Sequence, residues 1–391
     1  MIGRVFAARA LRAFADGLVA VVLPAYLLAL GMGQLEVGFI STATLLGSAL
    51  GTLAVGRWGH RFPIRRLLLA AALLMAATGC AFAGLDSFWP LLVVSFVSTI
   101  NPGSGDASLF APLEHTMLAS APAQARTNIF ARYSFIGSMC GAGGSLFAAA
   151  PEWLAGVGWS MVGALQAMFL VYGAVGVLVW FLYRGLPALE AQTSEAPLGP
   201  SRAMVWRLAA LFSVDSFAGG LVVNSLLALW LFERYGMSLA AAGAFFFWTG
   251  LFSAVSQLLA GPLARRIGLV NTMVFTHIPS SLFLIGAALA PTLDLALGLL
   301  LARSALSQMD VPTRSAFVMS VVTPAERPAA ASFTAVPRSL ASSVSPSLTG
   351  AMFAAGAMAT PLVACGVLKI AYDLALLAAF RRVEAARGGL A

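Results

Sequence analysis

The sequence predicts an all-α membrane protein with twelve transmembrane helices in two pseudo-symmetric six-helix bundles and with both termini in the cytoplasm. Three observations predict this fold class. The chain of 391 residues is 60% hydrophobic and only 10% charged, whereas a soluble domain carries about 25% charged residues. Its apolar runs are long enough to cross a bilayer, which takes about 20 helical residues. Its basic residues cluster in alternate loops, as expected for a chain that crosses a membrane repeatedly.

The apolar runs are candidate spans. Backbone groups in lipid are satisfied only in helices or closed barrels, and runs of leucine, alanine, valine and phenylalanine without a period of two indicate helices. The basic chain start has no small-residue cleavage site after a short apolar region, so we expect the first span to be retained. In chain order the expected spans are 12–31, 35–55, 67–84, 88–118, 129–149, 159–183, 204–232, 238–260, 269–290, 293–322, 331–357 and 361–380.

The basic residues indicate which loops are cytoplasmic. Arginines precede the first span, follow the last and occupy the connections after the even-numbered spans, as Arg57, Arg184 and Arg265 do. The opposite loops contain one basic residue, Arg234. Because Lys and Arg near helix ends favour the cytoplasmic side, both termini are expected there. Topology and attraction to anionic lipid explain the net charge of +8, which therefore does not indicate a nucleic-acid partner.

The two halves of the chain resemble each other. Residues 31–61 and 236–266 align without gaps, and both stretches begin with Gly-Met and end with arginine. Duplicated halves imply a pseudo-two-fold axis along the membrane normal and a site between the halves. We therefore expect an N-terminal six-helix bundle over 1–186, a polar, proline-containing cytoplasmic linker over 187–203, and a C-terminal six-helix bundle over 204–391.

A short motif resembles a known family. Residues 56–68, GRWGHRFPIRRLL, resemble the loop between helices two and three of the major facilitator superfamily, whose pattern is G-x-x-x-D-R-x-G-R-K/R-x-x-L. Length, span number, duplication and central linker extend the resemblance to the whole chain, and it implies a transporter that works by alternating access. The loop-motif residues are Gly56, His60, Arg61, Arg65 and Arg66.

The motif departs from the family pattern at two positions. His60 stands where the family usually has an aspartate, and Pro63 replaces a glycine. In the family, that aspartate pairs with charges on neighbouring helices and holds one conformation. His60 either replaces it as a titrating group or is a solvated loop histidine.

Spans four and ten carry polar residues at corresponding positions in the two halves. In 101–106, NPGSGD, proline and glycine prevent a continuous helix, and in 303–314, RSALSQMDVPTR, Pro312 is expected to bend the helix. Broken backbone at membrane depth is tolerated only inside protein or along a cavity. Ionisable groups there are functional candidates, since an unpaired charge in lipid is costly. The pathway candidates in these spans are Asn101, Asp106, Arg303 and Gln308.

Spans one and seven complete the expected cavity, because helices one, four, seven and ten line it in the resembled family. Asp16 lies in span one, and Asp215 and Asn224 lie in span seven. Asp106 and Asp215 are the candidates for proton coupling, because opening of a cavity changes the burial that controls a carboxylate. The alternative is that either carboxylate only pairs with Arg303 to fix helix packing.

Charged residues near the cytoplasmic ends of spans four, five, ten and eleven form a symmetric set. Glu114 and Asp310 lie toward the ends of spans four and ten, and Arg132 and Arg338 follow the starts of the next spans. We expect Glu114–Arg132 and Asp310–Arg338 to be cytoplasmic gate pairs that form when the cavity faces outward, with Arg314 at the same boundary.

Some polar residues within spans are expected to pair locally, including the pathway candidate Asp16, and the others are expected to be structural. Arg12 with Asp16, and Lys369 with Asp373, are four residues apart and are expected to neutralise each other on one helix face. His277 lies in span nine, which is peripheral in the resembled family. The three cysteines lie apart within spans, without the spacing of a metal site.

These features predict a secondary transporter and not an enzyme. We expect proton-coupled efflux of a small organic compound. The alternatives are uptake of a nutrient or of an organic anion held by Arg303, and a membrane scaffold or assembly factor that transports nothing. The expected partners are a small-molecule or ion substrate, protons and the lipid bilayer, with no nucleic acid, cofactor or metal. The protein is expected to be a multi-pass monomer of the plasma membrane, the inner membrane in a bacterium.

Overall fold

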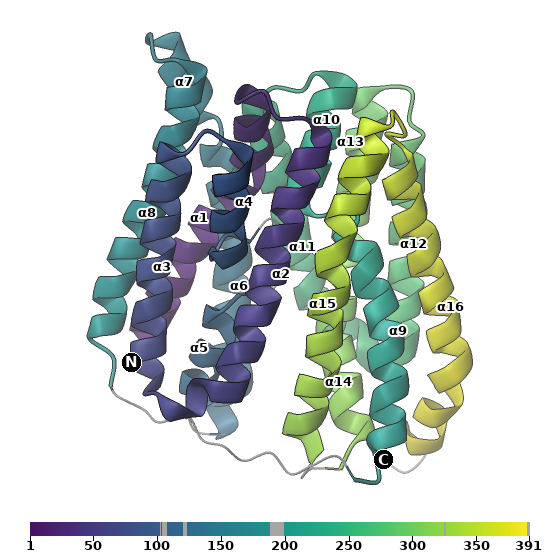
Figure 1. The fold of residues 1–391 in the computed structure, drawn as a ribbon. Helices are drawn as coiled ribbons and strands as arrows, with labels where there is room; N and C mark the ends of the chain where they lie inside the picture. Colours follow the sequence, from purple (N-terminus) through teal and green to yellow (C-terminus); the bar gives the residue numbers. More distant parts are fainter. Residues whose placement is uncertain (102, 104–107, 120–122, 188–198, 324–325, 389–391) are drawn as a thin grey trace. The chain divides into compact units, whose positions relative to one another are not determined.

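The computed structural model describes residues 1–101, 103, 108–119, 123–187, 199–323 and 326–388 (Figure 1). All regular secondary structure in these ranges is helical. The elements are α1 (Ile2–Ala29), α2 (Gln34–Trp58), η1 (Gly59–Arg61), α3 (Ile64–Gly84), α4 (Phe88–Val97), α5 (Phe110–Ala119), α6 (Ala123–Phe147), α7 (Ala150–Gly156), α8 (Met161–Arg184), α9 (Arg202–Gly220), α10 (Asn224–Tyr235), α11 (Leu239–Ile267), α12 (Leu269–Ala288), α13 (Leu293–Ser307), α14 (Asp310–Val321), α15 (Arg327–Ala354) and α16 (Thr360–Gly388).

The structure confirms the all-helical fold class. Over the described residues, eight segments are long and apolar enough to cross a membrane, with α9 and α10 taken together as one. They correspond to the predicted spans one, two, three, six, seven, eight, nine and twelve. Spans four and ten are each divided into two shorter helices, and α6 and α15 contain more polar residues. The count of twelve spans and the cytoplasmic termini therefore stay predictions.

Two of the predicted spans are interrupted near their polar residues. The described backbone between α4 and α5 is not helical, in agreement with the predicted break at 101–106, although most of that stretch lies outside the described residues. Span ten is interrupted at Gln308 and Met309, and not at Pro312. Pro312 lies in the first turn of α14, where its missing N–H removes no helical hydrogen bond.

A third break, in span seven, is not among the expected features. α9 ends at Gly220, and α10 begins at Asn224. A Cβ atom at Gly220 would collide with the side chain of Ser345 and the backbone oxygen of Ser342 on α15. Only glycine permits this approach, and two adjacent glycines disfavour helix. The pair Gly219–Gly220 is therefore the sequence signal for this break.

Contacts divide the chain into two units, each described by itself. In unit 1, α1 packs against α6 and α8, and α3 packs against α8. In unit 2, α12 packs against α13, α14 and α16, and α9 packs against α16. The predicted division into bundles 1–186 and 204–391 stays a prediction. Unit 1 comprises 1–193, 223–248 and 346–356, and unit 2 comprises 194–222, 249–345 and 357–391.

Each unit has its own packing device. In unit 1, a Cβ atom at Gly17 would collide with the backbone of Gly141, and one at Gly144 would collide with the backbone of Phe14. The helices α1 and α6 therefore touch through glycine, as helices in membranes often do. In unit 2, a core of large apolar side chains fixes α9, α12, α14 and α16, and it includes Val205, Phe212, Val274, Phe317 and Tyr372. These four helices carry the polar residues of the candidate site.

Candidate functional site

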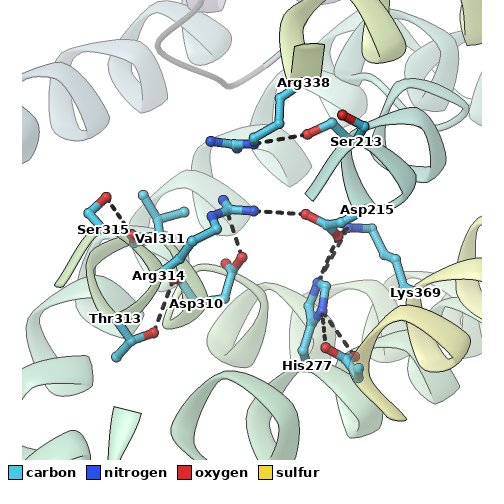
Figure 2. Close-up of polar contacts among 12 residues, drawn as sticks. Ser213, Asp215, His277, Asp310, Val311, Thr313, Arg314, Ser315, Arg338 and Lys369 are labelled. Atoms are coloured by element: carbon cyan, nitrogen blue, oxygen red, sulfur yellow. Dashed lines mark hydrogen bonds and ion pairs between the residues drawn. The ribbon is translucent and has the colours of Figure 1, made fainter. Parts of the chain in front are cut away.

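Asp215 of α9 lies at the centre of a buried network in unit 2, with Arg314 on one side and Lys369 on the other (Figure 2). Its Oδ1 accepts a hydrogen bond of 2.6 Å from Lys369 Nζ on α16, and its Oδ2 accepts one of 2.8 Å from Arg314 Nη1 on α14. The Asp215 side chain is 7% exposed. Charge-assisted hydrogen bonds of this kind are about twice as strong as neutral ones. Two cations therefore hold one carboxylate and join three helices through it.

His277 of α12 connects this carboxylate to a second one. Its Nδ1 lies 3.1 Å from Asp373 Oδ1, and its Nε2 lies 3.3 Å from Lys369 Nζ and 3.9 Å from Asp215 Oδ1. Asp373 is fully buried. Lys369 and Asp373, expected to neutralise each other, instead bind Asp215 and His277. Both side chains of α16 bind partners on other helices, α9 and α12. The i,i+4 rule considers only partners within one helix and therefore could not predict these contacts.

Arg314 binds a third carboxylate, within its own helix. Its Nη2 lies 3.3 Å from Asp310 Oδ2, one turn away on α14. Arg338 of α15 donates from Nε to Ser216 Oγ at 3.1 Å. The predicted gate pair Asp310–Arg338 is therefore not formed in this structure. The i,i+4 spacing places Asp310 and Arg314 on one helix face, so Asp310 already has a counter-charge.

Unit 1 contains a second buried ion pair. Arg12 of α1 binds Glu114 of α5, and the Glu114 carboxylate also accepts hydrogen bonds of 2.6 Å from Tyr133 and from Tyr183. Glu114 is fully buried. The Arg12 guanidinium lies 4.1 Å from the centroid of the Phe110 ring, a favourable cation–π distance. We refer to Arg12, Glu114, Tyr133 and Tyr183 as the Glu114 cluster.

The Glu114 cluster differs from two predicted pairs. Glu114 does not bind Arg132, which is exposed on α6. Arg12 binds Glu114 and not Asp16, whose charged neighbours are Arg12 and Arg9. Asp16 itself is half-buried. Local spacing could not reveal the partner of Arg12, because Glu114 lies 102 residues away in the chain.

The remaining polar candidates of spans four, seven and ten lie at the helix breaks. Asn101 is buried, and its Oδ1 accepts a hydrogen bond of 3.0 Å from the Gly103 N–H, a local turn typical of asparagine. Asn224 is the first residue of α10, and Gln308 lies at the break between α13 and α14; both are half-buried. Asp106 lies outside the described residues.

Arg303 of α13 is half-buried. Its backbone oxygen lies 3.5 Å from Ser280 Oγ. In the described ranges, no carboxylate forms an ion pair with Arg303. The alternative in which Asp215 pairs with Arg303 is therefore not formed in this structure, because Lys369 and Arg314 occupy both oxygens of Asp215.

The loop motif forms the connection from α2 to α3. Its centre is the 3-10 turn η1, and Arg65 donates from Nη1 to the backbone oxygen of Leu186 at 3.2 Å. Arg65 therefore ties the start of α3 to the chain just after α8. A Cβ atom at Gly56 would meet open space, Arg61 and Arg66 are exposed, and the side chain of His60 lies outside the described part.

Three network residues are absent from the predicted pathway and gate residues: Lys369, His277 and Asp373. Lys369 has a sequence signal, because it is the only lysine in the chain. Arginine and lysine are not interchangeable, since the lysine ammonium is compact and responds readily to burial. A single lysine among many arginines, placed inside a span, therefore marks a special position. His277 and Asp373 carry only the general signal of an ionisable residue within a span.

Within unit 1, segments from the two halves of the sequence are packed together at loops predicted to lie outside the cell. Glu152 of α7 accepts hydrogen bonds from the N–H groups of Leu239 at 2.7 Å and Ala240 at 3.3 Å, at the start of α11. A carboxylate at a helix N-terminus is favourable. We refer to this contact as the Glu152 cap. Gln34 Nε2 also donates to Glu233 Oε2 at 2.8 Å.

The same region contains a close contact between α2 and α15. A Cβ atom at Gly38 would collide with the backbone of Pro346 and Gly350. The Ser347 N–H donates to Thr42 Oγ1 at 2.9 Å. These contacts hold the ends of the helices closed in unit 1.

The sequence of the chain matches a known protein family and is similar to a yeast membrane protein. The family model described as Major Facilitator Superfamily matches residues 5–346. An uncharacterized membrane protein of Saccharomyces cerevisiae is 24% identical over 415 residues, which cover 96% of this chain and 93% of that protein.

Solved structures resemble this chain over nearly its whole length. The inward-facing, occupied structure of a bacterial homolog of the human lysosomal transporter Spinster has a TM-score of 0.77 and 16% identity, and the match covers 97% of each chain. A D-xylose–proton symporter has a TM-score of 0.73 and 15% identity, and the match covers 96% of this chain and 97% of that one. At these identities the structural likeness shows the fold. The family match over residues 5–346, together with this helical fold, shows that the chain belongs to the major facilitator superfamily and is a multi-pass secondary transporter of small solutes, not an enzyme.

Proposed function

We propose that this transporter exports a small organic compound in exchange for protons. The observation that supports the proposal is the buried network around Asp215, which includes carboxylate, imidazole and ammonium groups from α9, α12, α14 and α16. Buried ion pairs are often no more stabilising than apolar side chains of similar volume. Ionisable groups at membrane depth are therefore functional candidates, and these groups are able to bind and release protons.

Proton-coupled transport requires that binding of a proton alters the ion pairs that join the helices. Lys369 and Arg314 hold α16 and α14 to α9 through Asp215. A proton taken up by the network alters the balance of charge and weakens one of these ion pairs. The helix α9 ends at the Gly220 break, so its movement does not have to pass into α10. In the proposed cycle, bundles 1–186 and 204–391 rock about a cytoplasmic linker, 187–203.

The predicted gate pairs fit this cycle as contacts of the opposite state. Glu114 binds Arg12, and Asp310 binds Arg314, in the present structure. We propose that Glu114 pairs with Arg132, and Asp310 with Arg338, when the cavity faces outward. In the same proposal Asp106 contributes to the proton pathway. The protein acts as a monomer in the plasma membrane, the inner membrane in a bacterium, with both termini inside.

Flux in proteoliposomes tests the proposal. Purified protein is reconstituted with a pH gradient and an internal pH-sensitive dye, and a panel of organic cations, anions and neutral compounds is added. At least one compound is expected to dissipate the gradient. Asp215→Asn is expected to reduce this flux to the level of empty liposomes, because Lys369 and Arg314 lose their shared counter-charge.

Two variants serve as controls. Asp294→Asn makes the same chemical change at an exposed position of α13 and is expected to retain wild-type flux. Asp215→Glu keeps the charge and is expected to retain part of the flux. A protein that folds but moves no compound under a pH gradient is a scaffold or assembly factor, and that result would falsify the proposal.

A specific observation supports a second candidate function, uptake of an organic anion. Arg303 is half-buried in α13, and no carboxylate among the described residues forms an ion pair with it. A buried cation gains from an anionic partner, and the carboxylate or phosphate of a solute supplies one. Arg303→Gln is expected to abolish uptake of an anion in this case and to leave export of a cation or neutral compound intact.

A further inference from the structure

His277 is bound on both sides within unit 2, and its contacts determine its tautomer. Nε2 lies 3.3 Å from the Lys369 ammonium, which donates to Asp215 at 2.6 Å. An ammonium group has donors and no acceptor, so Nε2 must present its lone pair to Lys369. The ring proton then lies on Nδ1, which donates to Asp373 Oδ1 at 3.1 Å. The imidazole is neutral in this arrangement.

The charges of the network balance in this state. The carboxylates of Asp215, Asp310 and Asp373 are matched by three cations, which are Lys369, Arg314 and Arg338. An added proton is therefore an uncompensated charge in a buried place, which is unfavourable unless contacts rearrange. Uptake of a proton by this network is therefore expected to change the contacts between its side chains.

The basic groups of the network differ in the contacts that a proton has to displace. Both oxygens of Asp215 already bind cations, Lys369 and Arg314, so a proton there has to break an ion pair before it can bind. By contrast, Asp373 Oδ2 has no hydrogen-bond partner in the described part of the chain, although it lies 3.1 Å from His277 Nδ1. A proton on His277 Nε2 has to displace only the 3.3 Å contact with Lys369, which is longer than the 2.6 Å and 2.8 Å contacts at Asp215, and the resulting imidazolium still faces the carboxylate of Asp373. The pair His277–Asp373 is therefore the base in the network that accepts a proton at the least cost in broken contacts.

The groups around His277 come from every helix that packs against α12. From α16 they are Lys369, Asp373 and Tyr372, whose ring centroid lies 6.3 Å from that of His277. The helix α9 contributes Asp215, which faces His277 directly. The helix α14 contributes Arg314, which binds Asp215, and Asp310, which binds Arg314. From α13, Arg303 meets α12 through its backbone oxygen.

We propose that His277, held by Asp373, takes up the coupled proton, and that this proton releases Lys369 from Asp215. Protonated Nε2 becomes a donor and faces the Lys369 ammonium at 3.3 Å, where two cations repel each other. The new Nε2–H then donates to Asp215 Oδ1, now 3.9 Å away, and replaces Lys369 there. The proton enters from water, no other bond is made or broken covalently, and α16 is uncoupled from α9.

The presence of a single lysine agrees with this role. Every other basic side chain apart from the histidines is an arginine. A guanidinium that binds a carboxylate with two nitrogens is harder to displace than an ammonium point charge. The exchange of partners at Asp215 therefore requires lysine at position 369. This inference rests on the proposed proton coupling and names the residues that perform it.

Nuclear magnetic resonance provides a test that needs no substrate. The protein is labelled with 15N-histidine and 15N-lysine and placed in lipid nanodiscs, so that Lys369 gives the only lysine side-chain signal. His277 is assigned by comparison with His277→Gln and with the double variant His60→Gln/His115→Gln. As the pH falls from about 8 to 5, the range in which histidine usually titrates, His277 is expected to become charged. The Lys369 signal is expected to move over the same pH interval.

Two variants separate this mechanism from a structural role. In His277→Gln the Lys369 signal is expected to be independent of pH, and in Lys369→Arg the titration of His277 is expected to persist while proton-driven flux is lost. If His277 stays neutral to pH 5, or if Lys369 does not respond to it, the inference fails. Should the linked titration occur in a protein that transports nothing, the proton site is retained and the proposed function is rejected.

Discussion

At the scale of single residues, buried carboxylates in this chain depend on complete sets of partners. Glu114 binds Arg12, Tyr133 and Tyr183 at a position without solvent exposure. Removing one partner of a buried ion pair leaves the other charge uncompensated and costs about 3–5 kcal/mol. We therefore expect Glu114→Gln to lower the thermal midpoint strongly, as measured by size-exclusion chromatography of heated protein in detergent.

A double substitution identifies the cause. Arg12→Gln combined with Glu114→Gln removes both charges and is expected to be more stable than Glu114→Gln alone. Arg132→Gln is the matched control, because Arg132 is exposed on α6 and its loss is expected to change stability little. Equal losses in Glu114→Gln and the double variant would contradict this explanation.

At the scale of elements, one side chain joins the starts of two helices in unit 2. Glu326, just before α15, accepts hydrogen bonds from Ser201 Oγ at 2.7 Å and Thr323 Oγ1 at 2.6 Å, and also from the N–H groups of Gly199 and Ser201. Ser201 is the N-cap of α9. The hydroxyl donors and then the backbone donors lower the pKa of Glu326 to about 2.

This contact predicts a pH dependence. Because the pKa of Glu326 is lower in the folded protein than the usual value of about 4.3, its contribution to stability is present above that pH. The contribution is lost as the pH falls from about 4 toward 2. Glu326→Gln is expected to lower the thermal midpoint at pH 7 and to reduce its decline over this acid range. Melting curves across the range test this, with Asp294→Asn as the exposed control, and parallel declines in variant and wild type would refute it.

At the scale of the whole molecule, the contacts at the predicted outer ends have to open during transport. The Glu152 cap binds the first amides of α11. Ser225 is fully buried, and its Oγ lies 3.2 Å from Ser41 Oγ. Loss of a cap costs about 1 kcal/mol, which corresponds to about a fivefold change in population. Glu152→Ala is therefore expected to raise labelling of a cysteine placed at Ser225 about fivefold.

The labelling uses an impermeant maleimide on intact cells, with the native cysteines replaced. Asp86→Ala removes an exposed carboxylate from a loop predicted to lie on the same side, and it is expected to leave the rate unchanged. If Glu152→Ala labels no faster than this control, the Glu152 cap does not hold the outer ends closed.

Several features could be predicted from the sequence because they depend on local composition. Spans such as 67–84 and 269–290 correspond closely to α3 and α12, since long apolar runs leave helix as the only stable choice in lipid. The interruption between α4 and α5, seen in the described residues there, could also be predicted, because proline and glycine act locally. The break at Gly220 was less visible, since it depends on the approach of α15.

The sequence by itself determined that the protein is helical and lies in a membrane, and it located the eight long apolar segments that the structure describes. Only the tertiary structure decided how the ionisable residues pair. Arg12 binds Glu114, and Lys369 binds Asp215 across 154 residues of chain. Hydropathy acts on each segment alone, whereas an ion pair depends on which distant helices become neighbours. Packing therefore placed Lys369 and His277 beside Asp215, and no spacing within α16 or α12 could have shown it.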